Sequence, residues 1–197
     1  MPSYQNYFDD QANKYSENSD KGFWVFLRKK EKEAVLKALE PFAGMRCVDL
    51  GCGSGYYTQL LLSYSPSLMV SIDRSLTMLY HLKGKGILRA QADIQTVAFQ
   101  NTFDRVLCAG ALEFLESIDP FLKNAKTLLA QDGLMTILLP KRGIWGFFYK
   151  IFHWSHSVPI QLFSYRKLEN KLNKYGFNLQ EITCPTPMTY VLKIVHR

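Results

Sequence analysis

The chain has 197 residues, of which 24 are Lys or Arg and 17 are Asp or Glu, giving a formal net charge of +7. Hydrophobic residues make up 47% and charged residues 21%, a balance that can fill a core and excludes disordered, collagen-like and coiled-coil chains. We expect a single domain over residues 1–197. No apolar run approaches the ~18 residues of a membrane span, and the polar, acidic first residues are unlike a signal peptide. A cytoplasmic protein is therefore expected.

The basic charge belongs to the last part of the chain. Residues 1–44 and 45–140 are each neutral, whereas residues 141–197 carry nine basic groups and two acidic ones. The chain has 13 Phe, 11 Tyr and 3 Trp, and these aromatic residues cluster: seven lie in residues 1–26 and eight in residues 144–165. The total charge alone would suggest a nucleic-acid partner, but its position does not.

The cysteines give no sign of a disulfide framework or a metal site. They are widely spaced, without a C-x-x-C pair, at Cys47, Cys52, Cys108 and Cys184. We expect them to be small buried side chains, and we expect no metal.

The first two thirds of the chain alternate between strand and helix patterns. Charged and apolar residues predict an amphipathic helix over residues 22–40, ended by Pro41. Strands are predicted at residues 46–50, 68–72, 86–90, 103–108 and 133–139, with helices at 56–62, 76–82 and 118–129 between them. Such alternation indicates βαβ units, and hence an α/β fold whose mostly parallel sheet is covered by helices on both faces.

The last third has a different pattern. Residues 141–163 are expected to be irregular, followed by a helix over residues 164–175 that begins at a Ser164 cap. Two closing strands are predicted at residues 177–183 and 188–195. The lysines of the helix lie opposite its leucines, so they form an ordinary solvated face and do not indicate nucleic-acid binding.

A glycine cluster, Val48-Asp-Leu-Gly-Cys-Gly-Ser-Gly55, joins the first predicted strand to the next helix. Glycines at this place let the backbone turn sharply and bring a ligand against main-chain amides at the helix N-terminus. The spacing is not the G-x-G-x-x-G of dinucleotide-binding folds, and the Gly-Lys-Ser/Thr of a P-loop is absent. Asp49 beside the loop would repel phosphate and attract an ammonium group.

Two further acidic residues follow strands. Asp73 ends the second predicted strand, where a carboxylate can accept both hydroxyls of a ribose. Asp93 and Ile94 follow the third, where they suit the amino group and ring of an adenine. The expected ligand has an ammonium group, a ribose and an adenine.

These motifs resemble those of class I S-adenosylmethionine-dependent methyltransferases of the small-molecule type, from about residue 7 to the end. The segments 48–55, 92–94, 103–113 and 128–135 are similar to motifs of that family. The resemblance implies a doubly wound, Rossmann-like seven-stranded sheet in the order 3-2-1-4-5-7-6 with the last strand antiparallel. It also implies S-adenosylmethionine as cofactor and S-adenosylhomocysteine as product.

The resemblance assigns residues to each part of the cofactor. Gly51, Cys52 and Gly53 would contact the methionine part, and Asp49 would bind its amino group or organise the loop. The remaining assignments are Asp73 with Arg74 for the ribose, Asp93 and Ile94 for the adenine, and Cys108 and Ala109 beside the sulfonium. Alternatively, Asp49 and Asp73 serve only as caps, and Ile94 and Cys108 are ordinary core residues.

The N-terminal residues 7–15 are similar to a segment that folds over the cofactor in small-molecule methyltransferases. We therefore expect residues 1–40 to form an N-terminal helical lid, with Tyr15 and Arg28 closing on the cofactor and Arg28 facing its carboxylate. Alternatively, Arg28 is one more charge on the solvated face of residues 28–33.

No catalytic residue follows from the cofactor motif. Methyl transfer from a sulfonium depends mainly on alignment, and a general base is needed only if the acceptor must lose a proton. The candidates are Glu113, His153 and His156, and each could instead be structural or solvated.

The sequence narrows the chemical class of the methyl acceptor only in part. The sequence Cys108-Ala-Gly-Ala-Leu112 lacks the Pro-Pro motif of enzymes that methylate nucleobase amino groups. The basic, aromatic residues 141–163 are expected as a substrate-side insertion that lines a pocket, docks on an anionic membrane surface or packs internally. We expect methyl transfer to an apolar, neutral or anionic small molecule or lipid-like acceptor, in the cytoplasm or peripherally at a membrane. The alternatives are an RNA or protein methyltransferase and a non-catalytic S-adenosylmethionine-binding protein; the oligomeric state is not predicted.

Overall fold

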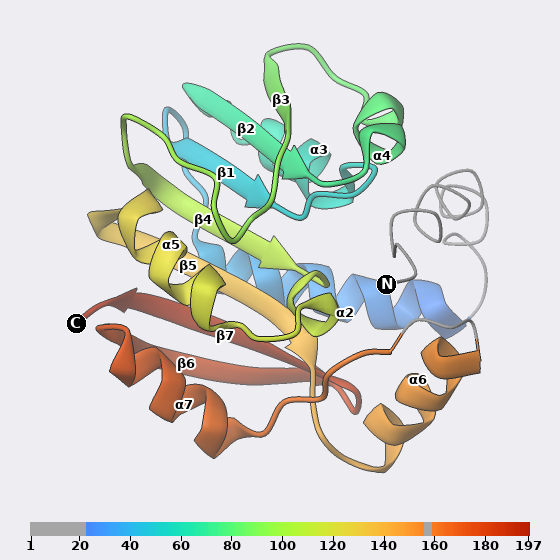
Figure 1. Ribbon diagram of the computed structural model, residues 1–197. Coiled ribbons are helices and arrows are strands. Elements are labelled where there is room, and N and C mark those ends of the chain that lie inside the picture. The colour runs from blue at the N-terminus through green and yellow to red at the C-terminus, as the bar shows by residue number, and fades with distance from the viewer. Residues whose placement is uncertain (1–22, 156–158) are drawn as a thin grey trace.

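The computed structural model describes residues 23–155 and 159–197, except for the side chains of residues 23–25, 152, 153 and 155. Seven strands form one sheet in the order β3-β2-β1-β4-β5-β7-β6 (Figure 1). The strands are β1 (Arg46–Leu50), β2 (Leu68–Asp73), β3 (Ile87–Gln91), β4 (Phe103–Ala109), β5 (Leu129–Pro140), β6 (Phe177–Thr186) and β7 (Thr189–His196). Strands β1 to β5 pair in parallel, and β7 runs antiparallel to both of its neighbours. The predicted fold class and strand order are confirmed.

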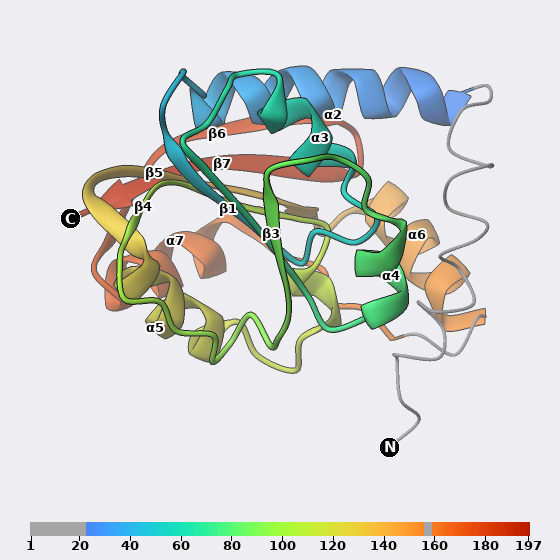
Figure 2. The same cartoon turned by 90° about the horizontal axis from the view of Figure 1, so that it is seen from above.

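Helices cover both faces of this sheet. They are α2 (Phe23–Leu39), α3 (Tyr56–Leu62), α4 (Leu76–His81), α5 (Asp119–Leu128), α6 (Ile144–Ser155) and α7 (Tyr165–Lys174), with a short 3₁₀ helix, η1 (Leu112–Phe114). Helices α2 and α3 lie on one face, and α5 and α7 lie on the other (Figures 1 and 2). The glycine loop between β1 and α3, the end of β2 and η1 all lie at the carboxyl edge of the parallel strands, where ligands bind in open α/β sheets.

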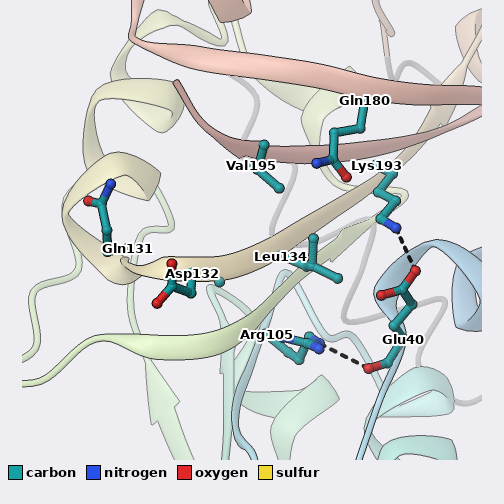
Figure 3. A pocket seen from close by; sticks show the side chains of 9 residues that line it. Glu40, Arg105, Gln131, Asp132, Leu134, Gln180, Lys193 and Val195 are labelled. Atoms are coloured by element: carbon teal, nitrogen blue, oxygen red, sulfur yellow. Dashed lines mark hydrogen bonds and ion pairs between the residues drawn. The ribbon is translucent and has the colours of Figure 1, made fainter.

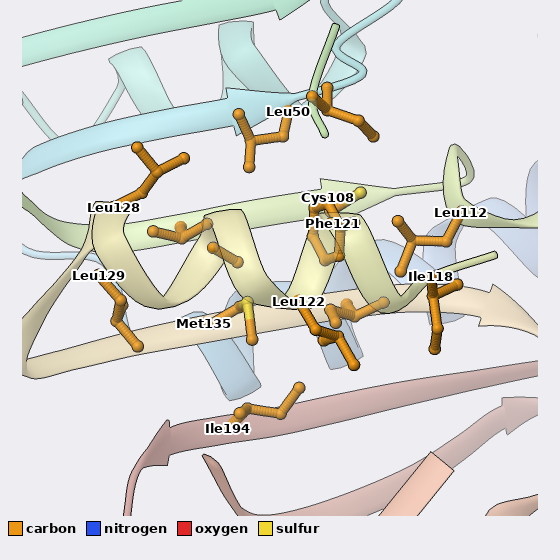
Figure 4. Close-up of a cluster of buried hydrophobic side chains, with 14 of the residues drawn as sticks. Leu50, Cys108, Leu112, Ile118, Phe121, Leu122, Leu128, Leu129, Met135 and Ile194 are labelled. Atoms are coloured by element: carbon orange, nitrogen blue, oxygen red, sulfur yellow. The ribbon is translucent and has the colours of Figure 1, made fainter. Parts of the chain in front are cut away.

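Alternation along the strands divides the core into two layers. In β4, Val106 and Cys108 pack in one hydrophobic cluster while Leu107 packs in the other, because successive side chains of a strand point to opposite faces. The larger cluster is closed by α5, whose Phe121 and Leu122 are fully buried against the sheet (Figure 4). A sheet buried on both faces explains why its central strands are short, nearly continuous apolar runs.

Helix α2 packs along β5, β6 and β7. Its buried side chains include Leu27, Val35 and Leu39, which recur at helical spacing and give the helix its inner face. Residues 23–39 of the expected lid are therefore a helix held on the sheet. Residues 1–22 lie outside the described part of the chain, so closure of this segment over the cofactor stays a prediction.

The expectation that residues 141–163 are irregular is wrong in part, because residues 144–155 form helix α6. Its apolar residues do recur at helical spacing, at positions 144, 147, 148, 151 and 154, but the basic and aromatic composition of the segment concealed this period. Gly146 allows α6 to pack against the residues that precede it, because a Cβ at this position would lie 2.1 Å from the Lys141 carbonyl oxygen. Two backbone hydrogen bonds join the two ends of this segment. The Arg142 amide donates to the Phe163 carbonyl at 2.7 Å, and the Phe163 amide donates to the Pro140 carbonyl at 3.1 Å.

Smaller differences concern the ends of elements. Strand β5 begins at Leu129, directly after α5, because Leu129 already pairs with Phe103 of β4. Strand β6 continues to Thr186, which pairs with Thr189 across the turn to β7. Ser164 does stand at the N-cap of α7, but its side chain makes no capping hydrogen bond.

Candidate cofactor and acceptor site

The glycine loop is built for a close backbone approach. Gly51, Gly53 and Gly55 have φ values of 75°, 53° and 88°, which side chains other than glycine rarely adopt. The amides of Gly51 and Cys52 donate to the Ile72 carbonyl of β2 at 2.8 and 2.9 Å. A Cβ at Gly51 would lie 2.4 Å from the Ala111 Cβ, whereas one at Gly53 would meet nothing within 4 Å. The space over Gly53 is thus open to a ligand.

Asp73 holds this loop from the end of β2. Its Oδ2 accepts the Gly53 amide at 2.7 Å, and its Oδ1 accepts the Ser75 amide at 2.9 Å. Ser75 in turn caps α4, its Oγ accepting the Met78 amide at 3.1 Å. A carboxylate at the carboxyl end of the second strand is where the fold places an acceptor for ribose hydroxyls. Its placement fits the role predicted for it.

Asp49 lies beneath the loop. It is 2% exposed, and its Oδ2 accepts the Thr58 hydroxyl at 2.7 Å. The Thr58 oxygen also lies 3.0 Å from the Ser71 hydroxyl oxygen, which extends the buried polar group to β2. Burial raises the pKa of the Asp49 carboxyl to about 7, and a cationic group bound nearby would lower it. These contacts support a loop-organising role, and a contact with the cofactor's amino group stays a prediction.

The residues assigned to adenine lie after β3. Asp93 Oδ2 accepts from the Arg74 guanidinium at 2.7 Å, and its Oδ1 accepts the Gln95 amide at 2.9 Å. Ile94 is buried in the larger hydrophobic cluster, and its carbonyl accepts from the Asn124 side chain at 3.1 Å. Arg74 and Asp93 thus form one charged pair next to Asp73, whereas Ile94 shares the core with α5.

The cysteines differ in their surroundings. Cys47 and Cys108 are buried, Cys52 is partly exposed and Cys184 is exposed, and all four are free thiols. Cys108 packs in the larger cluster and Ala109 against the smaller one. Burial raises the pKa of the Cys108 thiol, so it is an uncharged apolar group at this place. The expected contact of Cys108 with the sulfonium stays a prediction.

Glu113 is the most unusual group on the acceptor side. It lies in η1, directly after β4, and is 3% exposed. Within the described part of the chain its Oε2 has no hydrogen-bond partner, while its Oε1 lies 3.9 Å from the position of a Cβ at Gly110. Burial raises the pKa of the Glu113 carboxyl to about 7. The backbone is held by the Gln161 amide, which donates to the Glu113 carbonyl at 2.8 Å.

A second carboxyl group, Glu31 of α2, was not predicted from the sequence. Its Oε1 accepts the Thr189 hydroxyl from the β6–β7 turn at 2.9 Å. Burial raises its pKa, an effect that Thr189 and the nearby Arg28 partly offset, and its negative charge also raises the pKa of Glu113. The sequence contained a signal for the burial of Glu31. This residue lies four positions after Leu27 and four before Val35, which are both buried, and residues at this spacing share one face of a helix.

The structure describes only some of the other predicted residues. Arg28 is partly buried, and its guanidinium carbon lies 5.9 Å from the centre of the Tyr56 ring, at the start of α3 after the glycine loop. Helix α2 thus brings Arg28 to the loop and not to a wholly solvated face. Tyr15 and His156 lie outside the described residues, as does the side chain of His153. Among the residues the structure describes, no group of three or more His, Cys, Asp or Glu could hold a metal ion.

A separate pocket of about 420 Å³ lies at the opposite, amino edge of the parallel strands. Its charged groups satisfy one another: Lys193 pairs with the Glu40 side chain, and Arg105 donates to the Glu40 carbonyl at 3.1 Å (Figure 3). The pocket lies at the other end of the strands from the glycine loop, and its Lys193, Arg105 and Glu40 are engaged with one another. We therefore assign the site to the carboxyl edge.

Comparison with known proteins shows which domain family the chain resembles. Residues 48–137 match the family model described as a methyltransferase domain. A comparison with curated protein sequences found no match.

Solved structures share the fold at low sequence identity. An S-adenosylmethionine-dependent methyltransferase from Mesorhizobium loti is 20% identical, with a TM-score of 0.72 and coverage of 85% of this chain and 98% of that one. Magnesium protoporphyrin IX methyltransferase from Synechocystis PCC 6803, with bound S-adenosylhomocysteine, is 15% identical, with a TM-score of 0.77 and coverage of 98% and 97%. A possible histamine N-methyltransferase from Thermotoga maritima is 17% identical, with a TM-score of 0.74 and coverage of 98% and 99%.

The matched residues 48–137 contain the glycine loop, Asp73, Asp93 and Glu113. They thus include carboxylates at the carboxyl edge of the sheet, together with the loop that is open over Gly53. Residues 48–137 therefore match a methyltransferase domain, and the chain has the fold shared by solved S-adenosylmethionine-dependent methyltransferases.

Proposed function

We propose that this methyltransferase acts on a small-molecule or lipid-like acceptor that is apolar, neutral or anionic, and whose reacting group gives up a proton. The observation that carries the proposal is the Glu113 carboxyl: it is buried at the carboxyl end of β4, and Oε2 has no partner within the described residues. A buried polar atom without a partner is costly and is common where a ligand completes the contact.

The roles of the residues follow from their positions. S-adenosylmethionine supplies an activated methyl group when bound. Asp73 and the glycine loop bind and orient it, and Asp49 keeps the loop in place. Glu113, with its pKa raised to about 7, suits a proton acceptor near neutral pH. Glu31 raises the pKa of Glu113 further through its negative charge and thereby increases its basicity.

Apolar character of the acceptor is supported by the segment after β5. A hollow of about 690 Å³ is lined there by Ile144, Phe147 and Phe148 together with Arg142 and Lys150. Apolar walls with two cations suit a hydrophobic molecule that carries negative charge away from its reacting group.

The first experiment measures cofactor binding. Calorimetric titration with S-adenosylhomocysteine should show binding to the wild-type chain and much weaker binding to Asp73→Ala. Absence of binding to the wild-type chain would refute the cofactor assignment.

The second experiment finds the acceptor class. Radiolabelled S-adenosylmethionine is incubated with the protein and with separate fractions of lipid and small metabolites, total RNA, and total protein. Label in the lipid and metabolite fraction supports the proposal. Label in RNA or protein alone contradicts it, and cofactor binding without label in any fraction supports a non-catalytic binding protein.

The third experiment tests Glu113 on whichever fraction is labelled. Glu113→Gln should lose at least about tenfold in turnover, a modest part of what general-base catalysis supplies, while its affinity for S-adenosylhomocysteine stays unchanged. Unchanged turnover and an unchanged pH profile would limit Glu113 to a structural role.

A further inference from the structure

Helix α6 exposes large apolar side chains to an unusual extent. The exposed fractions are 77% for Ile144, 58% for Trp145, Phe147 and Phe148, 43% for Ile151 and 73% for Trp154. In α5, by contrast, Phe121, Leu122 and Leu128 are buried, and α2, α3, α4 and α7 each expose no more than two large apolar side chains among the described residues. A contiguous exposed apolar patch of this kind marks an interaction surface.

The exposed side chains share one side of the helix. At ~100° per residue, positions 144, 145, 147, 148, 151 and 154 fall within roughly half of the circumference. Gly146 lies on the opposite side and is buried against the Lys141 carbonyl and the Leu162 side chain. The helix is therefore attached to the domain through its glycine side, which leaves the aromatic half turned outward.

The charge around this face is entirely basic. Lys141, Arg142 and Lys150 are the charged residues between positions 141 and 155, and no acidic residue occurs in that range. Arg142 and Lys150 line the same hollow as Phe147 and Phe148. Cations beside exposed aromatic rings are complementary to a surface that places anionic phosphate next to hydrocarbon.

The dimensions exclude a spanning role for this helix. Its 12 residues extend for about 18 Å, short of the ~30 Å of a bilayer core. No helix in the described part of the chain has the length and apolar character needed to cross a membrane. Tryptophans near both ends, Trp145 and Trp154, match the preference of this side chain for the membrane–water interface.

We propose that α6 docks the enzyme on the surface of an anionic lipid bilayer. Its aromatic half enters the boundary between headgroups and acyl chains, and Arg142 and Lys150 contact lipid phosphates. Because α6 lies beyond the carboxyl end of β5, on the side of the molecule that holds the cofactor loop (Figure 1), docking there would present the site to the membrane. This last consequence rests on the proposed function, whereas docking itself does not.

The test is flotation of the full chain with phosphatidylcholine vesicles that contain or lack phosphatidylglycerol. The wild-type chain should float with the phosphatidylglycerol vesicles at low salt and be released by high salt, as expected for screened charges. The double variant Phe147→Ser/Phe148→Ser should bind at least about tenfold more weakly, because it removes two aromatic rings whose transfer out of water favours binding. The variant Arg142→Glu/Lys150→Glu should lose the preference for phosphatidylglycerol.

Matched controls change the same kinds of residue elsewhere. Leu88 is 61% exposed on the edge strand β3, and Lys167 is exposed on α7; Leu88→Ser and Lys167→Glu should float like the wild-type chain. Titration with S-adenosylhomocysteine shows that the α6 variants remain folded, because that site is separate from α6.

Three outcomes would overturn the proposal. The first is no flotation of the wild-type chain at low salt, and the second is equal flotation of wild-type chain and α6 variants. The third is a dimer, seen by light scattering, that is lost in Phe147→Ser/Phe148→Ser while no variant binds vesicles, because α6 would then be a contact between copies. Loss of vesicle binding with intact cofactor binding leaves the methyltransferase assignment standing, so the two failures are distinguishable.

Discussion

The amide of Gly53 donates to Oδ2 of Asp73 at 2.7 Å and thereby joins the loop after β1 to the end of β2. The two residues are 20 positions apart in the chain, and their contact exists because β1 and β2 are parallel neighbours whose carboxyl ends meet. The same carboxylate also accepts the Ser75 amide. One side chain thus shapes the loop and holds the start of α4.

Removal of this carboxylate should weaken cofactor binding strongly. A hydrogen bond to a charged group contributes about 1.5–3 kcal/mol, so Asp73→Ala should raise the Kd for S-adenosylhomocysteine by at least about tenfold. Calorimetry measures the change, and Asp132→Asn, at an exposed position, is the control with equal loss of charge. Similar Kd values for Asp73→Ala and the wild-type chain would remove Asp73 from the cofactor site.

Gly51 should tolerate no side chain. In Gly51→Ala the new Cβ meets the Ala111 Cβ, 2.4 Å away, at a backbone φ of 75°. We expect a loss of at least about 1 kcal/mol from the left-handed conformation alone, with a further cost from the clash and weaker S-adenosylhomocysteine binding. Denaturant unfolding and calorimetry measure the two effects.

The contribution of the clash can be separated from that of the backbone. The double variant Gly51→Ala/Ala111→Gly removes the clash and should recover part of the lost stability but not the backbone cost. Gly143→Ala, where a Cβ meets nothing within 4 Å, should leave both measurements near wild type. If Ala111→Gly gives no recovery, the contact with Ala111 is not what requires glycine at position 51.

Glu113 should make the protein less stable as the pH rises. Its pKa is raised by burial from an ordinary value of 4.5 to about 7, so the folded state holds a proton that the unfolded state has released. The favourable contribution is complete below about pH 4.5 and is lost as the pH rises toward 7. Since one pKa unit corresponds to ~1.4 kcal/mol, up to about 3 kcal/mol is at stake.

The variant Glu113→Gln keeps the shape and removes the titration. It should be more stable than the wild-type chain at pH 8 and should show a flatter pH dependence between pH 5 and 7. Urea unfolding across this range measures both. A part of the slope should remain, because burial raises the pKa of Asp49 to about 7 as well. Parallel curves for the variant and the wild-type chain would contradict a buried, protonated Glu113.

Core and surface substitutions near α5 should differ severalfold in cost. Phe121 is fully buried between α5 and the sheet, and Phe121→Ala should lose about 3–5 kcal/mol because it removes the ring and leaves a cavity. The Lys171–Asp119 ion pair at 2.7 Å is about one third exposed on both sides, and Lys171→Ala should cost less than about 1 kcal/mol. Denaturant midpoints measure the difference, and equal costs would contradict the assigned burial.

Prediction from sequence succeeded where the signal was local. The glycine loop, the strand that ends at Asp73 and the alternating strands and helices are each recognisable from a few consecutive residues, and the structure has these elements in the expected order. It failed at α6, whose apolar residues recur at helical spacing within a basic, aromatic segment that we expected to be irregular. It also missed Glu31, which six consecutive charged residues concealed.

The sequence by itself determined the strand and helix order, the loop between β1 and α3, and the acidic residue at the end of β2. These depend on backbone preferences and on apolar runs, which are properties of short segments. The tertiary structure alone decided which charged residue of α2 turns inward, that Glu113 is buried with no partner for Oε2 among the described residues, and that the aromatic residues after β5 face outward. Burial is a property of what packs against a side chain, and the segments that pack together here are distant in the sequence.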